Sequence, residues 1–172
     1  MPADPLPALA AAERRLIVLT SAGASFEQIA ADPETRLRLG DVRSAIEAVL
    51  VTTGNRTVPQ LAGWATAHRI VTQPVHPSGA LTIKPSLAPR LSQVLRGWAG
   101  GRSTPELTAD FGISSTTMRS YTKTLLSTLN VDSDTQAVVV GVLAELVLLS
   151  DIDPAWPAEP LARTAGTRSA AP

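Results

Sequence analysis

The segment from Ser115 to Lys123 combines short polar side chains with two cations, Arg119 and Lys123. Residues four apart share one face of a helix, so a helical register here would place both cations together. The free amides and the positive dipole end of a helix N-terminus attract phosphate, and side chains just inside it reach base edges in a major groove. The segment therefore predicts a nucleic-acid-reading helix over about residues 115–128.

The candidate contact residues share a polar or basic side chain at or near the start of a predicted helix. In the second part of the chain they are Arg102, Ser103, Thr104, Ser115, Thr116, Thr117, Arg119, Ser120 and Lys123. In the first part they are Arg36, Arg38, Arg43 and Ser44. The simpler interpretation of both sets is that they cap and solvate surface helices. In the first part this alternative is stronger, because Glu47 takes the place of Lys123 and Asp41 lies nearby.

Apolar periodicity and capping signals predict the helices that would position these residues. Leu91, Val94, Leu95 and Trp98 follow the i, i+3, i+4, i+7 spacing of one helical face. Ser25 with Gln28 and Ser103 with Glu106 have the spacing of capping boxes. Further helices are expected over about residues 8–22, 41–53, 58–68 and 134–149, with Gly54 as a natural stop for the second of them.

The same pattern of residues occurs twice along the chain. Gly23-Ala24-Ser25 aligns with Gly101-Arg102-Ser103, an offset of 78 residues. Val42-Arg43-Ser44 aligns with Met118-Arg119-Ser120, and Gln60 with Gln136, an offset of 76 residues. The change places two extra residues in the first copy around residues 34–39, where a turn would tolerate them.

These patterns predict an all-α protein of two tandem four-helix helix-turn-helix domains, at residues 8–70 and 87–150. A proline-containing linker is expected over residues 71–86, with Pro74, Pro77 and Pro85. Residues 151–172 contain Pro154, Pro157 and Pro160 in a mixture of small residues and Arg, which predicts a disordered tail.

The last predicted helix is apolar on nearly all sides, whereas a surface helix normally has a single apolar stripe. At least two of its faces therefore need cover, either from a second copy of the chain or from the first domain. The simpler alternative is burial within its own domain and under the linker. The residues expected at this dimer or interdomain interface are Val139, Val142, Leu143, Leu146 and Val147.

Composition narrows the function classes. Fifteen basic residues balance fifteen acidic ones, so nucleic-acid affinity would have to come from a locally positive face rather than from bulk charge. The chain has no cysteine and two histidines, which excludes thiolate zinc sites and argues against a His-rich metal site. No arrangement of catalytic side chains, cofactor motif, signal segment or membrane span stands out. We therefore expect a cytoplasmic protein that is not an enzyme and has no cofactor or metal.

Residues 87–149 resemble the LuxR/GerE-type helix-turn-helix domain. The positions that carry the resemblance are Leu87, Arg90, Val94-Leu95, Ala99, Gly101, Ser103, Glu106-Leu107, Gly112-Ile113-Ser114, Thr117-Met118-Arg119, Leu129, Val131 and Thr135-Gln136-Ala137-Val138. The resemblance implies four helices, the third of which reads DNA, with Arg119 where the family usually has Lys and a last helix that often mediates dimerisation. Thr128 and Asp134 depart from it, since the family often has basic residues there. Residues 9–70 are similar to the same domain in a degenerate form.

Residues and resemblance together predict a sequence-specific, double-stranded-DNA-binding regulator of bacterial transcription. The alternative is a protein-interaction module that keeps the fold but contacts RNA polymerase, a sigma factor or another regulator. Zero net charge, Asp41, Glu47 and Asp134 favour this alternative.

Overall fold

The computed structural model describes residues 7–73 and 85–161. Within these ranges the protein is all-helical, as the sequence predicts, and its extended pairing is limited to one isolated bridge between Leu148 and Pro160. The first half contains α1 (Ala11–Ser21), α2 (Phe26–Ala31), a 3-10 turn (Leu39–Asp41), α3 (Val42–Thr53) and α4 (Val58–Ala67). The second half contains α5 (Pro89–Ala99), α6 (Thr104–Asp110), α7 (Ser115–Leu129), α8 (Asp134–Leu143) and the short α9 (Leu149–Ile152).

Side-chain caps set the starts of the helices that carry the candidate residues. Ser25 and Ser103 each form a capping box, with Gln28 and Glu106 respectively, as their spacing predicts. Ser114 Oγ accepts a hydrogen bond from Thr117 N at 3.1 Å and so begins α7. Gly54 ends α3 in the left-handed conformation, with φ 71°.

The first and last of the four main helices in each half have the same bounds under the offsets read from the sequence, whereas α6 ends one residue later than α2 and α7 begins three residues earlier than α3. Adding 78 to the bounds of α1 gives those of α5, and adding 76 to the bounds of α4 gives those of α8. Even an unusual backbone feature recurs, because Arg69 (φ 59°) and Glu145 (φ 61°) are separated by 76 residues. The two extra residues of the first half lie in the segment between α2 and α3, where Thr35 is buried and its hydroxyl donates to Ile29 O at 2.9 Å.

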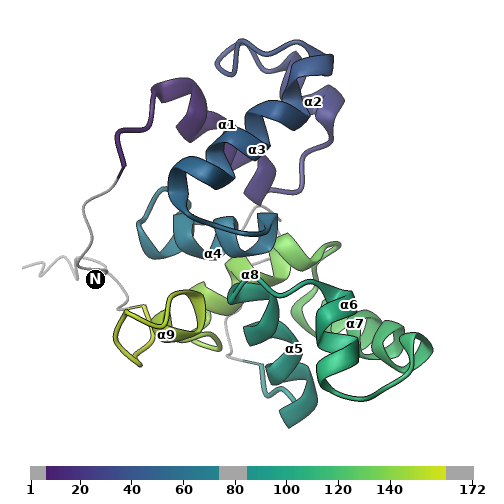
Figure 1. Cartoon of the computed structure of the whole chain (residues 1–172). Helices are drawn as coiled ribbons and strands as arrows, with labels where there is room; N and C mark the ends of the chain where they lie inside the picture. The colour runs from purple at the N-terminus through teal and green to yellow at the C-terminus, as the bar shows by residue number, and fades with distance from the viewer. Residues whose placement is uncertain (1–6, 74–84, 162–172) are drawn as a thin grey trace, which may run out of the picture.

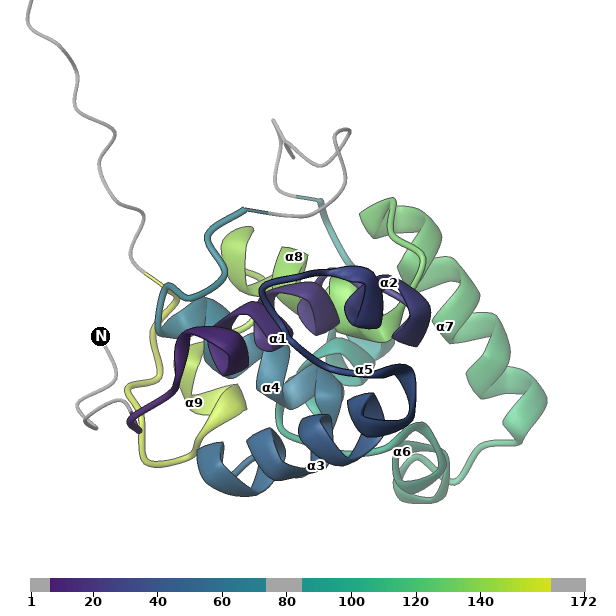
Figure 2. The ribbon, with the colours of Figure 1, turned by 90° about the horizontal axis from the view of Figure 1, so that it is seen from above.

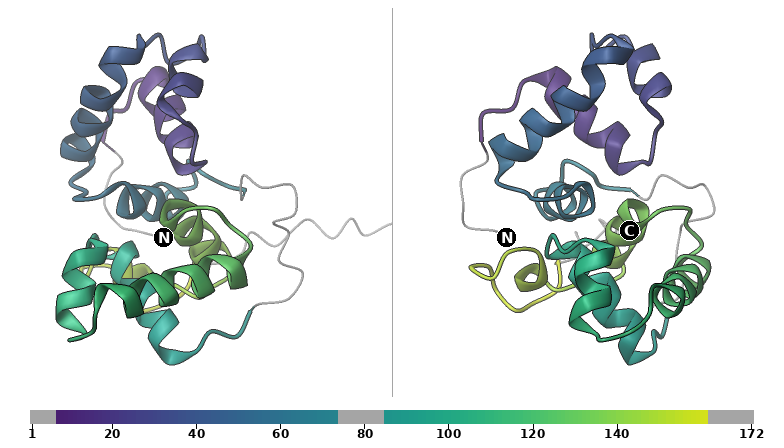
Figure 3. Two further views of the ribbon diagram at one scale, coloured as in Figure 1. Left: turned by 90° about the vertical axis from the view of Figure 1, so that its right-hand side faces the viewer. Right: turned by 45° about the vertical axis from the view of Figure 1, so that its right-hand side comes forward.

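The two halves share one hydrophobic core. In Figures 1 and 3, α4 and α8 lie side by side at the centre, with α1–α3 on one side and α5–α7 on the other. Residues 61–67 of α4 are all buried, as are residues 137–142 of α8. Helices that are apolar all round need cover on every face, and each of these two provides cover for the other.

The structure corrects the sequence-based prediction for the last helix, because α8 ends at Leu143 rather than near residue 149. Glu145 adopts a left-handed conformation, and Leu146 N donates to Gly141 O at 2.8 Å, so a Schellman-type turn closes the helix. This turn directs Val147 back into the core, where it is 1% exposed.

Residues 151–161 were expected to be disordered, and this prediction is wrong. Leu149 N donates to Glu159 O at 2.9 Å, and Trp156 and Leu161 are buried in the common core. Two large apolar side chains therefore fix a segment whose prolines and small residues suggested a tail. Residues 162–172 of that tail lie outside the described residues. So do residues 74–84 of the expected linker, whose first residue, Val71, is buried.

Candidate nucleic-acid interface

Helix α7 lies at the outer edge of the second half, as the view in Figure 2 shows. Met118, Leu125 and Leu129 are buried and hold it against the core. Most of the other positions on the helix are exposed or half-buried. The packing thus divides α7 into one anchoring stripe and a broad face open to solvent.

The exposed face of α7 carries most of the residues expected there. Ser115, Thr116, Arg119, Ser120 and Lys123 are exposed. Thr117 is half-buried, and its hydroxyl lies 2.9 Å from Ser114 Oγ, so it serves the helix start. No residue of Ser115–Leu129 is acidic, and no ion pair within the described residues involves Arg119 or Lys123. This face can present two cations to an anion without first breaking a salt bridge.

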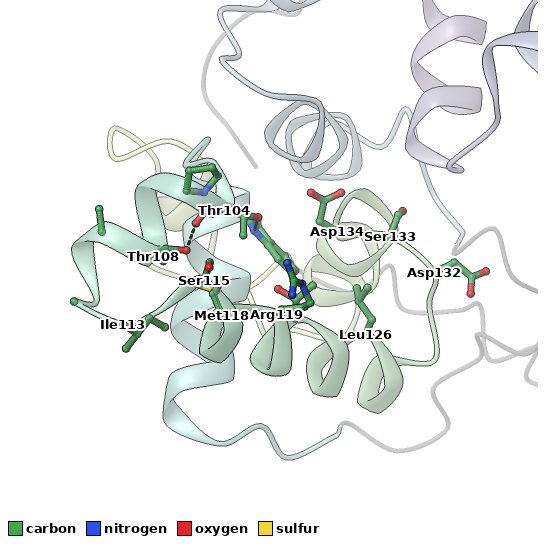
Figure 4. A pocket seen from close by; sticks show the side chains of 15 residues that line it. Thr104, Thr108, Ile113, Ser115, Met118, Arg119, Leu126, Asp132, Ser133 and Asp134 are labelled. Atoms are coloured by element: carbon green, nitrogen blue, oxygen red, sulfur yellow. Dashed lines mark hydrogen bonds between the residues drawn. The ribbon is translucent and has the colours of Figure 1, made fainter.

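A groove of about 760 Å³ runs along one side of α7, between α6 and the start of α8. Its lining includes apolar side chains, among them Trp98, Met118 and Leu126. Figure 4 shows the Arg119 side chain in this groove, between Thr104 of α6 and Asp134 of α8. Arg119 therefore forms part of both the exposed face and the groove wall, which also includes the carboxylates of Asp132 and Asp134.

The structure uses the three candidate residues before and in α6 for internal contacts. The guanidinium of Arg102 is ion-paired with the carboxylate of Asp110. Ser103 belongs to the capping box, and Thr104 Oγ1 accepts from Trp98 Nε1 at 3.2 Å. Arg102 is exposed, but contact with a phosphate would compete with its own ion pair.

Glu106 is a polar residue whose contact between the halves sequence reasoning missed. Its carboxylate accepts from Ser103 N at 2.7 Å and from Arg56 Nη2 at 3.0 Å. The hydrogen bonds from Ser103, with a smaller contribution from Arg56, lower the pKa of Glu106 to about 2. The Ser-x-x-Glu spacing indicated the capping role, but a contact across 50 residues left no local signal.

In the first half the four candidate residues do not form a comparable cationic face. Arg38 is paired with Asp41 at 2.9 Å, and the Arg43 guanidinium lies 5.8 Å from the centroid of the Phe26 ring. Arg36 is exposed in a left-handed turn, with φ 55°. Ser44 is exposed on α3 one turn before Glu47, which is also exposed.

The same face of the first half exposes large apolar side chains. Phe26, Leu39 and Val51 have exposed fractions of 38%, 51% and 83%, and they are the exposed large hydrophobic residues of the described part of the chain. By the 76-residue offset, Leu39 and Val51 stand where α7 has Ser115 and Ser127. The two equivalent helices thus present different chemistry to solvent.

The residues expected at a dimer or interdomain interface are covered within the chain. Val139, Val142 and Val147 are at most 2% exposed, whereas Leu143 and Leu146 are half-buried. The most extensive contact between helices in the molecule is that of α8 with α4 of the first half. The apolar faces of α8 are therefore occupied mainly by the protein's own helices.

Within residues 7–73 and 85–161, none of the helices combines the length and the apolar character that a membrane span requires. Nor do three or more His, Asp or Glu side chains gather there into a group that could hold a metal ion.

Comparison with protein families assigns a similarity to the segment that contains α7. Residues 85–141 fit the family model described as bacterial regulatory proteins, luxR family. The matched segment contains α5, α6, α7 and most of α8. No curated protein and no solved structure matches the chain. The second half of this protein therefore contains a segment, residues 85–141, that is similar to bacterial regulatory proteins of the luxR family.

Proposed function

We propose that this protein is a sequence-specific DNA-binding regulator of bacterial transcription, with α7 as its reading helix. The observation that carries the proposal is the acid-free, exposed face of α7 with its two cations, Arg119 and Lys123, inside the segment that matches the luxR family model. Insertion of this face into a major groove would bring Arg119 and Lys123 to phosphates or base edges.

The short polar residues of α7 would complete the contact. Ser115, Thr116 and Ser120 are exposed and can exchange hydrogen bonds with phosphate or bases. A neutral protein gains little from long-range attraction to DNA, so binding would depend on these local contacts. Ser103 and Thr104 would contribute indirectly, by fixing α6 against α7.

We further propose that the first half is a second, diverged copy of the same domain. The coinciding bounds of α1 with α5 and of α4 with α8, the matched capping boxes and the recurring left-handed turn at Arg69 and Glu145 support this proposal. Arg43 then stands where α7 has Arg119, and Glu47 where it has Lys123. DNA contact by this copy would be weaker, because Glu47 repels phosphate.

A protein-interaction role is the second candidate, and the exposed Phe26, Leu39 and Val51 are the observation that favours it. Such a surface could bind RNA polymerase or another regulator. The two roles are compatible if the first half binds protein and the second half binds DNA.

Fluorescence anisotropy with a randomised pool of DNA duplexes, followed by selected sequences, tests the DNA-binding proposal. The variant Arg119→Ala/Lys123→Ala is compared with Arg14→Ala/Arg90→Ala, which removes the same charge from exposed positions on other helices. We expect the first variant to bind at least tenfold more weakly and to lower the log–log salt slope by about two. The control should bind as the wild type does. Absence of binding at low salt, or equal losses in both variants, would refute the role of α7.

A further inference from the structure

The contacts between the halves have the reciprocity of a two-fold symmetric dimer. In such a dimer equivalent surfaces meet, so that if residue i of one copy contacts residue j of the other, j also contacts i. Here the equivalent helices α4 and α8 contact each other directly. The cross contacts α1 with α8 and α5 with α4 also occur as a pair.

A pair of glutamines gives the reciprocity at atomic detail. Gln136 Nε2 donates to Ala22 O at 2.8 Å, and a Cβ added to Gly23 would lie 2.9 Å from that same nitrogen. In the equivalent place, the Gln60 side chain lies against Gly101, where an added Cβ would overlap it. Each half thus supplies a glutamine that packs on the other half's glycine corner.

Both glutamines are held in place by the same local hydrogen bond. Gln60 Oε1 accepts from Arg56 N and Gln136 Oε1 accepts from Asp132 N, each at 2.8 Å. The acceptor end of each side chain therefore satisfies its own helix start, and its amide group faces the other half. The donor ends have different partners, because Gln136 Nε2 donates to Ala22 O whereas Gln60 Nε2 donates to Ile152 O at 3.2 Å. The shared acceptor bond and the shared packing on a glycine corner are what two copies of one interface would retain after fusion into one chain.

The interface leaves no comparable surface for a second copy of the chain. Gly63 of α4 lies so close to α8 that an added Cβ would be 3.0 Å from Val138 Cγ1. Val138 and its neighbours on α8 are buried in the same core as α4. A second copy could use α4 or α8 only by displacing one half of the first.

The two exposed reading faces differ, so the pair is symmetric in its backbone but not in its chemistry. Arg43 and Arg119 are equivalent positions with the same side chain. At the other equivalent positions, Glu47 corresponds to Lys123 and Val51 to Ser127. Dimers of identical copies read palindromic sites because their two heads prefer the same half-site. Two reading faces with different side chains would not share a preferred half-site, so their combined site would not be palindromic.

We propose that the protein is a single-chain pseudo-dimer in which the α4–α8 interface takes the place of dimerisation, so that one copy of the chain binds a non-palindromic DNA site. This inference rests on the proposed DNA-binding function for its second part. Its first part, the fixed internal pairing of the halves, is independent of DNA.

The internal pairing can be tested on the full chain without DNA. The protein has no cysteine, so Val51→Cys and Ser127→Cys, at equivalent exposed positions, would carry two spin labels for distance measurement by electron–electron resonance. We expect one narrow distance distribution that does not change when labelled chains are diluted tenfold with unlabelled wild type. A distribution that disappears on dilution, or one too broad for a fixed pair, would overturn the pseudo-dimer.

Gly63→Leu, which places a side chain between α4 and α8, should broaden this distribution. Gly40→Leu is the matched control, because nothing lies within 4 Å of a Cβ added there. Circular dichroism shows whether Gly63→Leu has unfolded. If it has, the dilution experiment on the doubly labelled chain without this substitution decides whether the halves are paired within one chain.

Native mass spectrometry of the wild type on its selected duplex tests the second part. We expect a complex of the duplex with one chain of 18.0 kDa and a selected sequence without two-fold symmetry. Two chains on a palindromic sequence would overturn the inference while leaving the proposed DNA-binding function intact. No complex with any duplex would instead refute the proposed function, and the spin-label result would stand alone.

Discussion

At the scale of single residues, Glu106 links a helix cap to the contact between the halves. Its carboxylate accepts from Ser103 of its own half and from Arg56 of the other half. The pKa of Glu106 falls from 4.5 to about 2, so the ionised form is favoured in the folded protein. A carboxyl whose pKa is lowered on folding stabilises the protein above its unfolded pKa, and this contribution is lost as pH falls through the folded value.

We therefore expect the Glu106 contribution to disappear between about pH 4.5 and pH 2. Glu106→Gln removes the titration but can keep the capping box, as Gln28 does in the first half. Urea unfolding at a series of pH values should show a smaller loss of stability for Glu106→Gln than for wild type across this window. Parallel losses in the two proteins would show that Glu106 does not contribute in this way.

The individual contact residues could be predicted only in part. The polar and basic face of α7 follows from the residues and the helical period, and the structure places Arg119 and Lys123 on it. The ion pairs of Arg102 with Asp110 and of Arg38 with Asp41 could not be predicted from the sequence. An arginine near a helix start can bind a phosphate of a ligand or pair with a nearby carboxylate of the protein, and the sequence alone is compatible with both.

At the scale of elements, α7 depends on its N-cap. Ser114 Oγ accepts from Thr117 N, and without it an amide at the start of the proposed reading helix would lose its partner. Because the first turn of α7 carries Ser115 and Thr116, a frayed start would also disturb the exposed face.

Ser114→Ala should lower the free energy of unfolding by about 1 kcal/mol. It should also weaken DNA binding, since Ser115 and Thr116 would lose their fixed positions. Ser127→Ala, an exposed serine in the last turns of the same helix, serves as the control. Thermal and urea unfolding measure the effect, and equal stability of the two variants would contradict the capping role.

Helix positions were predictable where periodicity and caps agreed, as for α5, α6 and α7. The end of α8 was not, because the apolar run from Ala137 to Leu149 continues across the turn at Glu145. An apolar run indicates burial, but burial is compatible with a turn that folds back on the core. The left-handed residue at that turn is Glu rather than the usual Gly, so the stop signal was missing.

At the scale of the whole molecule, the halves are joined by their cores rather than only by the chain between them. Leu61 and Ala62 of α4 belong to the same buried cluster as Ala137 and Val138 of α8. Domains with a common core unfold together, whereas separate domains can unfold one at a time.

We expect one cooperative unfolding transition with the same midpoint in both halves. Variants that retain only Trp64 or only Trp98 would report on the first and second half by fluorescence. Val138→Ala, at a fully buried position of α8, should lower both midpoints together, by roughly 1–3 kcal/mol in unfolding free energy. Two separate midpoints, or a shift in the second half alone, would contradict the shared core.

The repeated residue pattern was visible in the sequence, and so was the need for cover on the last helix. The sequence did not decide whether a second copy of the chain or the first half provides this cover. A hydrophobic pattern shows that a helix face must be buried, but not which surface buries it. Packing of α8 on α4, and burial of Trp156 beyond the predicted tail boundary, are long-range outcomes that local patterns do not encode.

A DNA-cleaving reagent placed on α7 tests directly whether this helix enters the DNA groove. Ser120→Cys would be the only cysteine of the chain and can carry an iron chelate that cuts nearby DNA. Ala155→Cys, an exposed position in the C-terminal segment after α9, is the comparison. We expect cleavage from position 120 within the selected binding site and none from position 155 there. Cleavage from 155 but not from 120, at duplex concentrations where the protein is bound, would show that α7 does not read the DNA.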